Sequence, residues 1–393
     1  MKYKYHLLIR TAKSEFRTWE NLTEKEKQFV IPIVEITRGD KIKTNKNENK
    51  KDINYEDKEI FYFYGKHLDR TKSLINERPC FVDTTPEDTL MCGELLNLRD
   101  YKNGYENWMN FLQDNFNVDN IYPILQVTDN ELSPDDYKNS LIQQITSLSN
   151  KYHTIGYRTS ILTDSDFLID LNILSIEIIK HIESGKEFFL IFDHEDIRPR
   201  TSLFHAHATK KVLDTILFKI PQIKIIILSN SFPKNVNEIG NGNSDNITIE
   251  EILLFKEIIK GNKYSNNIYY GDYGSINSIR NDGKIGGRGW TPRIDIPSID
   301  KITYYKEKKE MENGKQKYPY NHYYYNIANK IVDNHDLFSS IPESWAKEQI
   351  IKASESPNSV PNSQPNFWIS VRMQLYLINI INQLDCIYNY KPK

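Results

Sequence analysis

The stretch Phe188 to His194 reads FFLIFDH, a continuous apolar run that ends in polar residues. A strand that is buried on both faces of a parallel sheet is apolar along its whole length. This stretch therefore predicts a buried strand, and the same pattern recurs along the chain. The seven other runs are His6 to Arg10 (HLLIR), Ile31 to Ile36 (IPIVEI), Cys80 to Thr84 (CFVDT), Tyr122 to Val127 (YPILQV), Thr154 to Thr159 (TIGYRT), Ile225 to Asn230 (IIILSN) and Ile268 to Asp272 (IYYGD).

Helix-like stretches separate these runs and give the chain an alternating β/α order. Pro134 to Leu148 begins with Asp135 and Asp136, and its later apolar residues recur at helical spacing. Proline and acidic residues favour the first turn of a helix. Further helices are predicted over residues 19–29, 165–182, 204–218 and 247–259. Strands and helices in this order predict an α/β fold, a (β/α)8 TIM-like barrel.

The repeating pattern changes near residue 275. We expect the barrel to occupy residues 1–275 and residues 276–393 to form an α-rich C-terminal extension that packs on it. Residues 38–57 are rich in Lys, Asn, Asp and Glu, which predicts a mobile charged insertion. The glycine-rich stretch 281–290 (NDGKIGGRGW) predicts a lid over the barrel mouth, a disordered loop or a contact with single-stranded nucleic acid.

The overall composition excludes several classes of protein. The formal net charge is -2 and the pI is about 6.5, so no overall positive field attracts nucleic acid. Cys80, Cys92 and Cys386 lack the spacing of a zinc site. No apolar run approaches the roughly 18 residues that span a bilayer, and the N-terminus does not resemble a signal peptide. We expect a cytoplasmic protein without membrane contact.

Polar residues at the carboxyl ends of the predicted strands mark the candidate site. In a parallel barrel these ends meet at one mouth, where active sites are built. Four of the residues are acidic, and converging carboxylates repel one another unless a cation or a basic side chain neutralises them. We expect them to be catalytic and to bind Mg²⁺ or another divalent metal. They are Glu35, Asp83, Asp193 and Asp272.

Two kinds of chemistry fit such a ring of carboxylates. A metal ion would activate water for phosphoester hydrolysis, which would make the chain a metal-dependent hydrolase. A carboxyl group with a raised pKa would instead act as a general acid or base. The alternative is structural, because the same residues also suit helix capping or salt bridges with Arg10 and Arg158.

A second group of strand-end residues is predicted to contact a ligand. The planar guanidinium of Arg158 suits the oxygens of an anionic substrate, and it equally suits the neutralisation of Asp193 or Glu35. Gln126 and Asn230 either orient a ligand or satisfy backbone groups of the loops. The predicted ligand contacts are Arg10, Lys13, Gln126, Arg158, Asn230 and Tyr273.

The strand that carries Asp193 continues with His194. Adjacent residues on a strand point to opposite sides of the sheet. Asp193 and His194 therefore cannot both face the barrel interior while the strand continues. We predict that His194 reaches the mouth only if the chain turns at this point.

Three short motifs lie far apart along the chain. The first is Lys13-Ser14-Glu15, which precedes IPIVEI; the second is GDYG, which precedes WTPRID; the third is SWAKEQI, which precedes WISVR. Together they resemble the beta protein family, which is found in phages and bacterial mobile elements.

The resemblance implies a part in phage–host conflict, such as defence against phages. It singles out Lys13, Glu15, Glu35 and Asp272 as matching positions. Where related chains place histidines late in the terminal helix, this chain has Met373-Gln374-Leu375. A role that depends on those histidines is therefore not expected here.

The sequence supports two hypotheses about function. In the first, the barrel mouth binds an anionic nucleotide or nucleic-acid-derived ligand, held by Arg158 and Lys13, and metal-assisted hydrolysis of a phosphoester follows. In the second, the barrel is a non-catalytic scaffold, and its C-terminal extension binds a protein partner encoded nearby. An exposed apolar patch on the extension would favour the second hypothesis.

Overall fold

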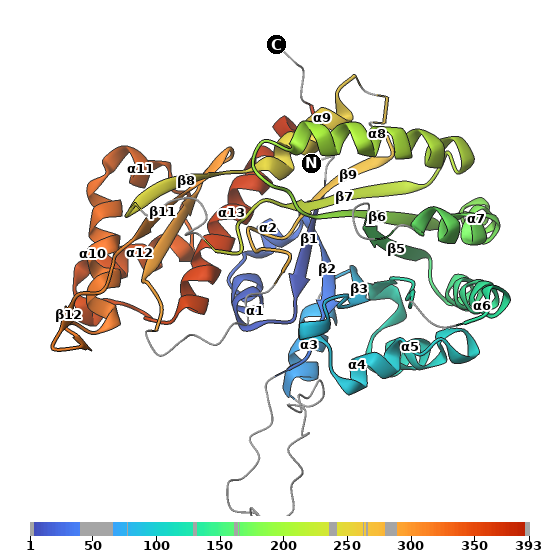
Figure 1. Ribbon diagram of the computed structural model, residues 1–393, viewed down its shortest axis with the longest axis horizontal. Helices are drawn as coiled ribbons and strands as arrows, with labels where there is room; N and C mark the ends of the chain where they lie inside the picture. Colours follow the sequence, from blue (N-terminus) through green and yellow to red (C-terminus); the bar gives the residue numbers. More distant parts are fainter. Residues whose placement is uncertain are drawn as a thin grey trace, which may run out of the picture.

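The computed structural model describes residues 4–39, 66–76, 78–128, 132–160, 164, 166–235, 242–261, 263–264, 266–279 and 289–389. Its centre is an eight-stranded parallel sheet that forms a nearly closed barrel (Figure 1). The strands follow one another around the barrel in chain order, and an isolated bridge from Ile124 to Gly156 joins the fourth to the fifth. They are β1 (Tyr5–Arg10), β2 (Val30–Ile36), β3 (Cys80–Thr84), β4 (Ile121–Pro123), β5 (Thr154–Ser160), β6 (Glu187–Asp196), β7 (Lys224–Asn230) and β9 (Ile268–Asp272).

The strands lie close to their predicted positions, so the α/β barrel is confirmed in this general form. β3 and β9 have the predicted bounds, whereas β4 is shorter than predicted. The ladder ends early because the backbone N–H of Gln126 donates to the side chain of Gln144 at 2.7 Å and not to a neighbouring strand.

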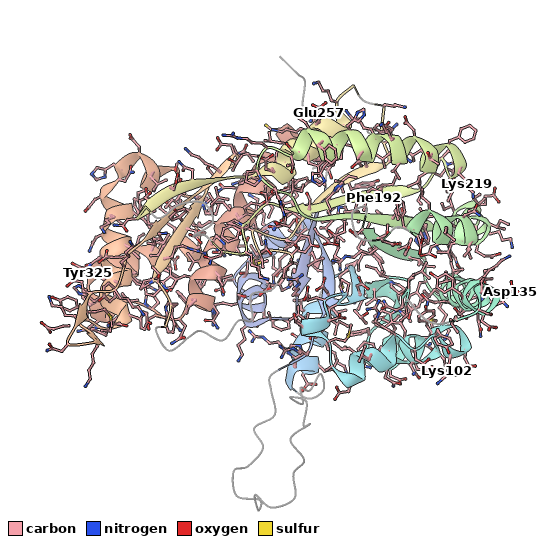
Figure 2. The ribbon with its side chains drawn as sticks, viewed as in Figure 1. Lys102, Asp135, Phe192, Lys219, Glu257 and Tyr325 are labelled. Atoms are coloured by element: carbon pink, nitrogen blue, oxygen red, sulfur yellow. The ribbon has the colours of Figure 1, made fainter. Side chains whose placement is uncertain are left out.

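Helices connect the barrel strands and cover their outer side (Figure 1). Charged side chains of these helices, such as Lys102, Asp135 and Lys219, point away from the ribbon into solvent (Figure 2). The connecting helices are α1 (Lys13–Glu20), α2 (Glu24–Lys27), α3 (Lys66–Asn76), α4 (Gly93–Leu98), α5 (Lys102–Asn115), α6 (Pro134–Lys151), α7 (Phe167–Glu183), α8 (Ser202–Lys219) and α9 (Glu250–Ile259). None of the helices in the described ranges is both long and apolar enough to cross a bilayer.

The predicted helix over residues 19–29 is wrong in its bounds. The structure has two short helices, because Thr23 begins a new one with a capping box. The Thr23 side chain accepts from the backbone N–H of Glu26 at 3.2 Å, and the Glu26 carboxylate accepts from the backbone N–H of Thr23 at 2.7 Å. Such reciprocal bonds fix a helix start.

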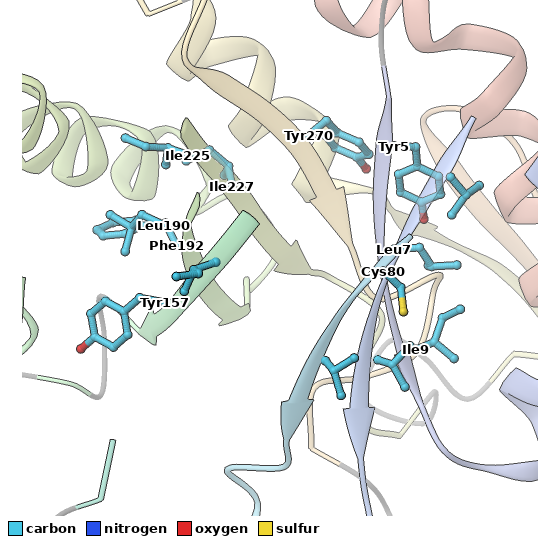
Figure 3. Close-up of a cluster of buried hydrophobic side chains, with 14 of the residues drawn as sticks. Tyr5, Leu7, Ile9, Cys80, Tyr157, Leu190, Phe192, Ile225, Ile227 and Tyr270 are labelled. Carbon is cyan, nitrogen blue, oxygen red and sulfur yellow. The ribbon is translucent and has the colours of Figure 1, made fainter. Parts of the chain in front are cut away.

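Side chains alternate between the two faces of the barrel wall. Leu190, Phe192, Ile225 and Ile227 face the helices and belong to the larger core cluster (Figure 3). Their neighbours along the same strands face the barrel interior and form a second cluster. That interior cluster contains Leu8, Ile33, Phe81, Ile124, Phe189, Ile191, Ile226, Leu228 and Tyr273. The alternation determines which strand-end residues reach the mouth.

The C-terminal extension contains more strand than predicted. β10 (Arg293–Pro297) and β11 (Lys301–Lys306) form an antiparallel sheet with β8 (Ser244–Thr248), which comes from the loop between β7 and α9. The remaining elements are β12 (Met311–Glu312), β13 (Lys315–Gln316), α10 (Tyr320–Asp333), α11 (His335–Ser340), α12 (Trp345–Glu355) and α13 (Pro365–Tyr388). The predicted helix over residues 247–259 thus begins late, since residues 244–248 pair with β11.

Helix α13 packs on the barrel with one side and on the extension with the other (Figure 1). Met373 and Tyr376 belong to the barrel cluster, whereas Val371 and Leu375 belong to the cluster of the extension. The backbone N–H of Tyr270 in β9 donates to the Tyr388 hydroxyl of α13 at 2.7 Å. The last helix of the chain therefore covers the barrel beside β9 and β1.

Two sequence predictions fall largely on residues that the structure does not describe. The charged insertion of residues 38–57 lies outside the described residues from residue 40 onward. The glycine-rich stretch is described only at residues 289 and 290, where Trp290 stacks on Tyr320 with ring centroids 4.0 Å apart.

Candidate functional site

The register of the first three strands places Arg10, Glu35 and Asp83 side by side. Arg10 pairs with Glu35 across β1 and β2, and Glu35 pairs with Asp83 across β2 and β3. Each residue lies two positions after an interior residue, so its side chain faces the inside of the barrel at the carboxyl end. These three predicted site residues are thus brought together.

Arg158 of β5 lies at the centre of the acidic residues. Its Nη1 donates to Glu35 at 2.7 Å and to Asp83 at 3.4 Å. Its Nε and Nη2 donate to one Asp193 oxygen at 2.9 and 2.7 Å. Burial alone would lower the pKa of Arg158, but Asp193, Tyr273 and Glu35 raise it well above its usual value. Arg158 therefore neutralises the carboxylates, which is the second of its two predicted roles.

Glu35 is fully buried between two arginines. The Arg10 Nε donates to Glu35 Oε1 at 2.9 Å, and the Thr85 hydroxyl donates to the same oxygen at 3.0 Å. Burial would raise the pKa of Glu35, but Arg10 and Arg158 outweigh it and hold the pKa at about 2. Glu35 is therefore an ionised structural partner of the two arginines.

Asp83 differs from Glu35 in its electrostatic state. Burial raises its pKa, and the attraction of Arg158 and the hydrogen bond from Gln126 do not compensate. The Gln126 Nε2 donates to Asp83 Oδ1 at 3.1 Å, while the Thr84 hydroxyl donates to Gln126 Oε1 at 2.5 Å. Two neighbouring carboxyl groups thus have pKa values shifted in opposite directions, as acid–base pairs in active sites do.

Asp193 joins the group from the opposite side of the barrel. The Tyr273 hydroxyl donates to Asp193 Oδ2 at 2.6 Å, and the backbone N–H of Glu195 donates to Asp193 Oδ1 at 2.8 Å. His194 faces the other side of the strand, where its Nε2 lies 3.1 Å from the Thr209 hydroxyl of α8. His194 therefore does not reach the mouth.

A cavity of about 1050 Å³ opens above these residues. Asp83, Gln126, Arg158, Asp193 and Tyr273 are among its lining residues. The described lining contains eight Asp or Glu residues and three Arg residues. A ligand with a negative group therefore needs a lining arginine whose charge is not already paired.

Arg99 meets this condition, although sequence reasoning did not select it. It lies at the end of α4 and lines the cavity. Its Nη2 donates to the Val127 carbonyl at 2.7 Å, and its buried Nε has no hydrogen-bond partner within the described residues. No ion pair of Arg99 occurs in the described parts of the chain. Arg99 follows a helix and not a strand, so the pattern of polar residues at strand ends does not indicate it.

Asp272 is not part of the mouth group, and its predicted convergence with the other three acids is wrong. It shares a face of β9 with Tyr270, which belongs to the cluster outside the barrel. Its carboxylate accepts hydrogen bonds from Tyr5, Tyr270 and Tyr376. The next residue, Tyr273, is the one that faces the interior.

Two other predicted ligand contacts lie away from the cavity lining that the structure describes. Asn230 bonds to the backbone of Phe232 in both directions, which satisfies loop backbone groups. Lys13 is exposed at the first residue of α1. The Arg10 guanidinium donates to the carbonyl groups of Asn277 and Ser278 as well as to Glu35. Of the predicted contacts, Arg10, Gln126, Arg158 and Tyr273 line the cavity.

The predicted metal site is not supported by the donor arrangement. Within the described ranges, no three His, Cys, Asp or Glu side chains are grouped so that they could hold a metal ion. The guanidinium of Arg158 lies between Glu35, Asp83 and Asp193 and supplies the positive charge that a cation would supply. This arrangement relieves the repulsion from which the metal was predicted.

Another carboxyl group in the cavity lining, that of Asp170, accepts hydrogen bonds from two tyrosines. Asp170 of α7 accepts from Tyr137 at 2.6 Å and from Tyr157 at 3.0 Å. Burial raises its pKa. Sequence reasoning missed this group because Asp170 lies in the first turn of a helix, where an acidic residue is expected for helix stability alone.

Comparisons with known proteins agree with the family resemblance that the three sequence motifs indicate. The family model described as "Beta protein" matches residues 5–382. The chain is 24% identical to "Protein beta" of Enterobacteria phage P4 over 380 residues, which is 95% of this chain and 92% of that protein. No solved structure matches the chain. Because the family model covers nearly its whole length, the chain belongs to the Beta protein family.

Proposed function

We propose that the cavity at the barrel mouth binds a ligand with an anionic group, such as a nucleotide. In this proposal Arg99 holds the anionic group, and Asp83 exchanges a proton with the ligand. The observation that carries it is that both side chains border one cavity and that neither is fully neutralised. We further treat the nearly closed barrel as a variant of the TIM type, in which ligands bind at this end.

The anionic contact is assigned to Arg99 because the other two lining arginines are engaged. Arg10 and Arg158 direct their donors at carboxylates, carbonyl groups and Tyr273. A guanidinium that already bonds several acceptors gains little from another anion. An arginine without an ion pair offers charge-assisted hydrogen bonds, which are about twice as strong as neutral ones.

Proton exchange is assigned to Asp83 because its pKa is raised while that of Glu35 is lowered. A general acid works best when its pKa is close to the pH of the reaction. Glu35 stays ionised beside it and fixes the position of Arg158. Metal-assisted hydrolysis of a phosphoester is not included in the proposal, since the described carboxylates are arranged around Arg158.

The scaffold hypothesis receives less support from the surface. Its expected apolar patch on the extension is not found there, since the described extension exposes only scattered large apolar side chains such as Met311 and Ile351. The most exposed ones in the described chain, Phe218 at 92% and Phe204 at 71%, lie on α8 of the barrel. We therefore propose the cavity, and not the extension, as the functional site.

The biological role that we propose is phage–host conflict, and the relative from phage P4 supports it. Cells that produce the chain should differ from control cells in their plating efficiency for at least one phage. Asp83→Asn and Arg99→Met should each remove that difference while the protein accumulates to its normal level. Unchanged plating with both variants would contradict a role for the cavity.

The binding proposal is tested by calorimetric titration of the full chain with AMP and with inorganic phosphate as probes. Loss of a charge-assisted hydrogen bond costs about 1.5–3 kcal/mol, so Arg99→Met should weaken AMP binding by about tenfold or more. Asp88→Asn is the control, because Asp88 is an exposed acid that lines the same cavity. It should not weaken binding.

The part played by Asp83 is tested by repeating the AMP titration at several pH values. The wild-type affinity should change as the pH rises above 3.8, the ordinary value for an aspartate, and Asp83→Asn should leave only the change that ionisation of the AMP phosphate causes. Failure of the wild-type chain to bind either probe at millimolar concentration would refute the anionic ligand. An unchanged pH profile in Asp83→Asn would refute the proton exchange.

A further inference from the structure

A second polar group is buried on the outer side of the barrel wall, away from the cavity. We call it the tyrosine–carboxyl cluster, and it holds two carboxyl groups that the proposed function does not use. It joins β1, β9, α9 and α13, and its members are at most 2% exposed. They are Tyr5, Glu251, Tyr270, Asp272 and Tyr376.

Asp272 accepts hydrogen bonds on both carboxylate oxygens. Oδ1 accepts from the backbone N–H of Gly274 at 2.7 Å and from the Tyr5 hydroxyl. Oδ2 accepts from the Tyr270 hydroxyl at 2.7 Å. Tyr5 and Tyr270 lie close together beside their strands, with ring centroids 5.8 Å apart (Figure 3). This set of donors stabilises the ionised form of Asp272.

Glu251 has fewer donors. The Ser231 hydroxyl donates to its Oε2. The Tyr376 oxygen lies 2.8 Å from Glu251 Oε1 and 2.9 Å from Asp272 Oδ2. The hydroxyl of Tyr376 therefore bridges the two carboxyl groups.

A count of protons shows that this bridge cannot form between two carboxylates. A tyrosine hydroxyl has one hydrogen, so it donates to one carboxylate only. If both groups were ionised, the second carboxylate would face the lone pairs of the same oxygen. With a proton on Glu251, that group donates to Tyr376, and Tyr376 donates to Asp272. Both contacts of the Tyr376 oxygen are then hydrogen bonds with one donor and one acceptor.

The groups that face the two carboxyls do not include a basic side chain among the described residues. β1 contributes Tyr5, β9 contributes Tyr270, α13 contributes Tyr376, and the loop after β7 contributes Ser231. The neighbouring Glu250 of α9 accepts from the backbone N–H of Arg200 at 2.8 Å. Arg372, one turn before Tyr376, is paired with Asp295 at 2.7 Å. A second negative charge in the cluster would therefore lack a counter-charge.

We propose that Glu251 and Asp272 share one proton, which resides on Glu251. The hydrogen bonds through Tyr376 that depend on this proton attach α13 to the barrel wall. Loss of the proton puts two negative charges on either side of Tyr376 and loosens the helix. The chain thus contains a pH-sensitive attachment of its last helix. This inference does not depend on a ligand at the barrel mouth.

The direction of the pH effect follows from the environment. Burial and the charge of Asp272 raise the pKa of Glu251 to about 7, compared with 4.5 for an ordinary glutamate. Burial also raises the pKa of Asp272. The attachment is therefore complete below pH 4.5 and is lost as the pH rises through about 7.

The test is amide hydrogen exchange of the full chain between pH 6 and pH 8, corrected for the intrinsic pH dependence of exchange. Protection of the barrel-facing part of α13 should fall by about tenfold for each pH unit between pH 4.5 and the Glu251 pKa of about 7, and it should level off above that value. Glu251→Gln keeps the shape and the donor but cannot ionise, so its α13 should stay protected at pH 8. Glu257→Gln on the same helix is the control and should behave like the wild-type chain.

A second measurement detects the proton directly and needs no variant that must fold. In infrared difference spectra of the wild-type chain, the C=O band of a buried protonated carboxyl group should be present at pH 6 and absent at pH 8. Absence of a carboxyl band that titrates in this range would overturn the proposal. Equal loss of α13 protection in the wild-type chain and in folded Glu251→Gln would also overturn it.

Discussion

Replacing Glu35 by glutamine should destabilise the barrel by an amount that follows from its environment. The two neighbouring arginines hold the pKa of Glu35 at about 2, compared with 4.5 in an unfolded chain. A difference of one pKa unit corresponds to about 1.4 kcal/mol. The ionised carboxylate therefore contributes about 3 kcal/mol to the free energy of unfolding at neutral pH, and Glu35→Gln should remove this contribution.

The pH dependence of the free energy of unfolding tests the same prediction in a second way. Because the folded pKa is lowered, the contribution is present above pH 4.5 and is lost as the pH falls through about 2. The wild-type chain should therefore lose stability over this range, and Glu35→Gln should lose less. The measurement is urea unfolding at several pH values, followed by circular dichroism and by tryptophan fluorescence. Trp108 is a suitable reporter, since it is fully buried and donates to the Ile124 carbonyl of the barrel wall.

Glu20→Gln is the matched control. Glu20 also pairs with an arginine, Arg70, at 2.7 Å, but its side chain is 55% exposed. An exposed pair of this kind contributes about 0–1 kcal/mol. The reasoning would be refuted if Glu35→Gln and Glu20→Gln had equal effects at pH 7, or if Glu35→Gln kept the full loss of stability in acid.

Two further predictions concern the contacts of α13. Arg372 pairs with Asp295 at 2.7 Å, both side chains are almost fully buried, and its guanidinium lies 3.8 Å from the ring centroid of Phe232. Arg372→Met should lower the free energy of unfolding by about 3–5 kcal/mol in urea titrations, and a loss below 1 kcal/mol would contradict a buried pair. Gly274 has a φ of +60°, and a Cβ at this position would lie 2.8 Å from Met373 Cε. Gly274→Ala should cost about 1–3 kcal/mol, and a double-mutant cycle with Met373→Ala should show a smaller cost in the truncated background.

The barrel strands were predictable because burial on both faces leaves an apolar run in the sequence. β3 and β9 have the predicted bounds. The extension sheet was not predicted, although β11 shows a strand period: along KITYYK every second residue is buried, and the residues between them are exposed or half-buried. β8 carries little signal, because four of its five residues are exposed and Ile247 alone is buried. Its position depends on pairing with a strand more than fifty residues later.

The site could be predicted only in part, because strand ends do not reveal which face a residue occupies. Asp83 and Asp193 each follow an interior residue by two positions, and both reach the mouth. Asp272 follows Tyr270 by two positions, and Tyr270 faces outward. The pairing of Arg158 with Glu35 joins residues 123 positions apart, so no local pattern could reveal it. Arg99 lies at the end of α4, so the pattern of polar residues at strand ends does not indicate it.

Asp272, the last residue of β9, and Tyr273, which follows it, connect the two networks, and the chemistry of each network sets the sign of its pH response. Tyr273 faces the mouth, where arginines keep Glu35 ionised. Asp272 faces α13, where hydroxyl groups supply hydrogen bonds but no positive charge. Acid therefore weakens the mouth, and alkali weakens the attachment of α13. Because the two pKa shifts have opposite signs, Glu35→Gln and Glu251→Gln should act on opposite sides of the stability maximum, and their effects should be separable by pH alone.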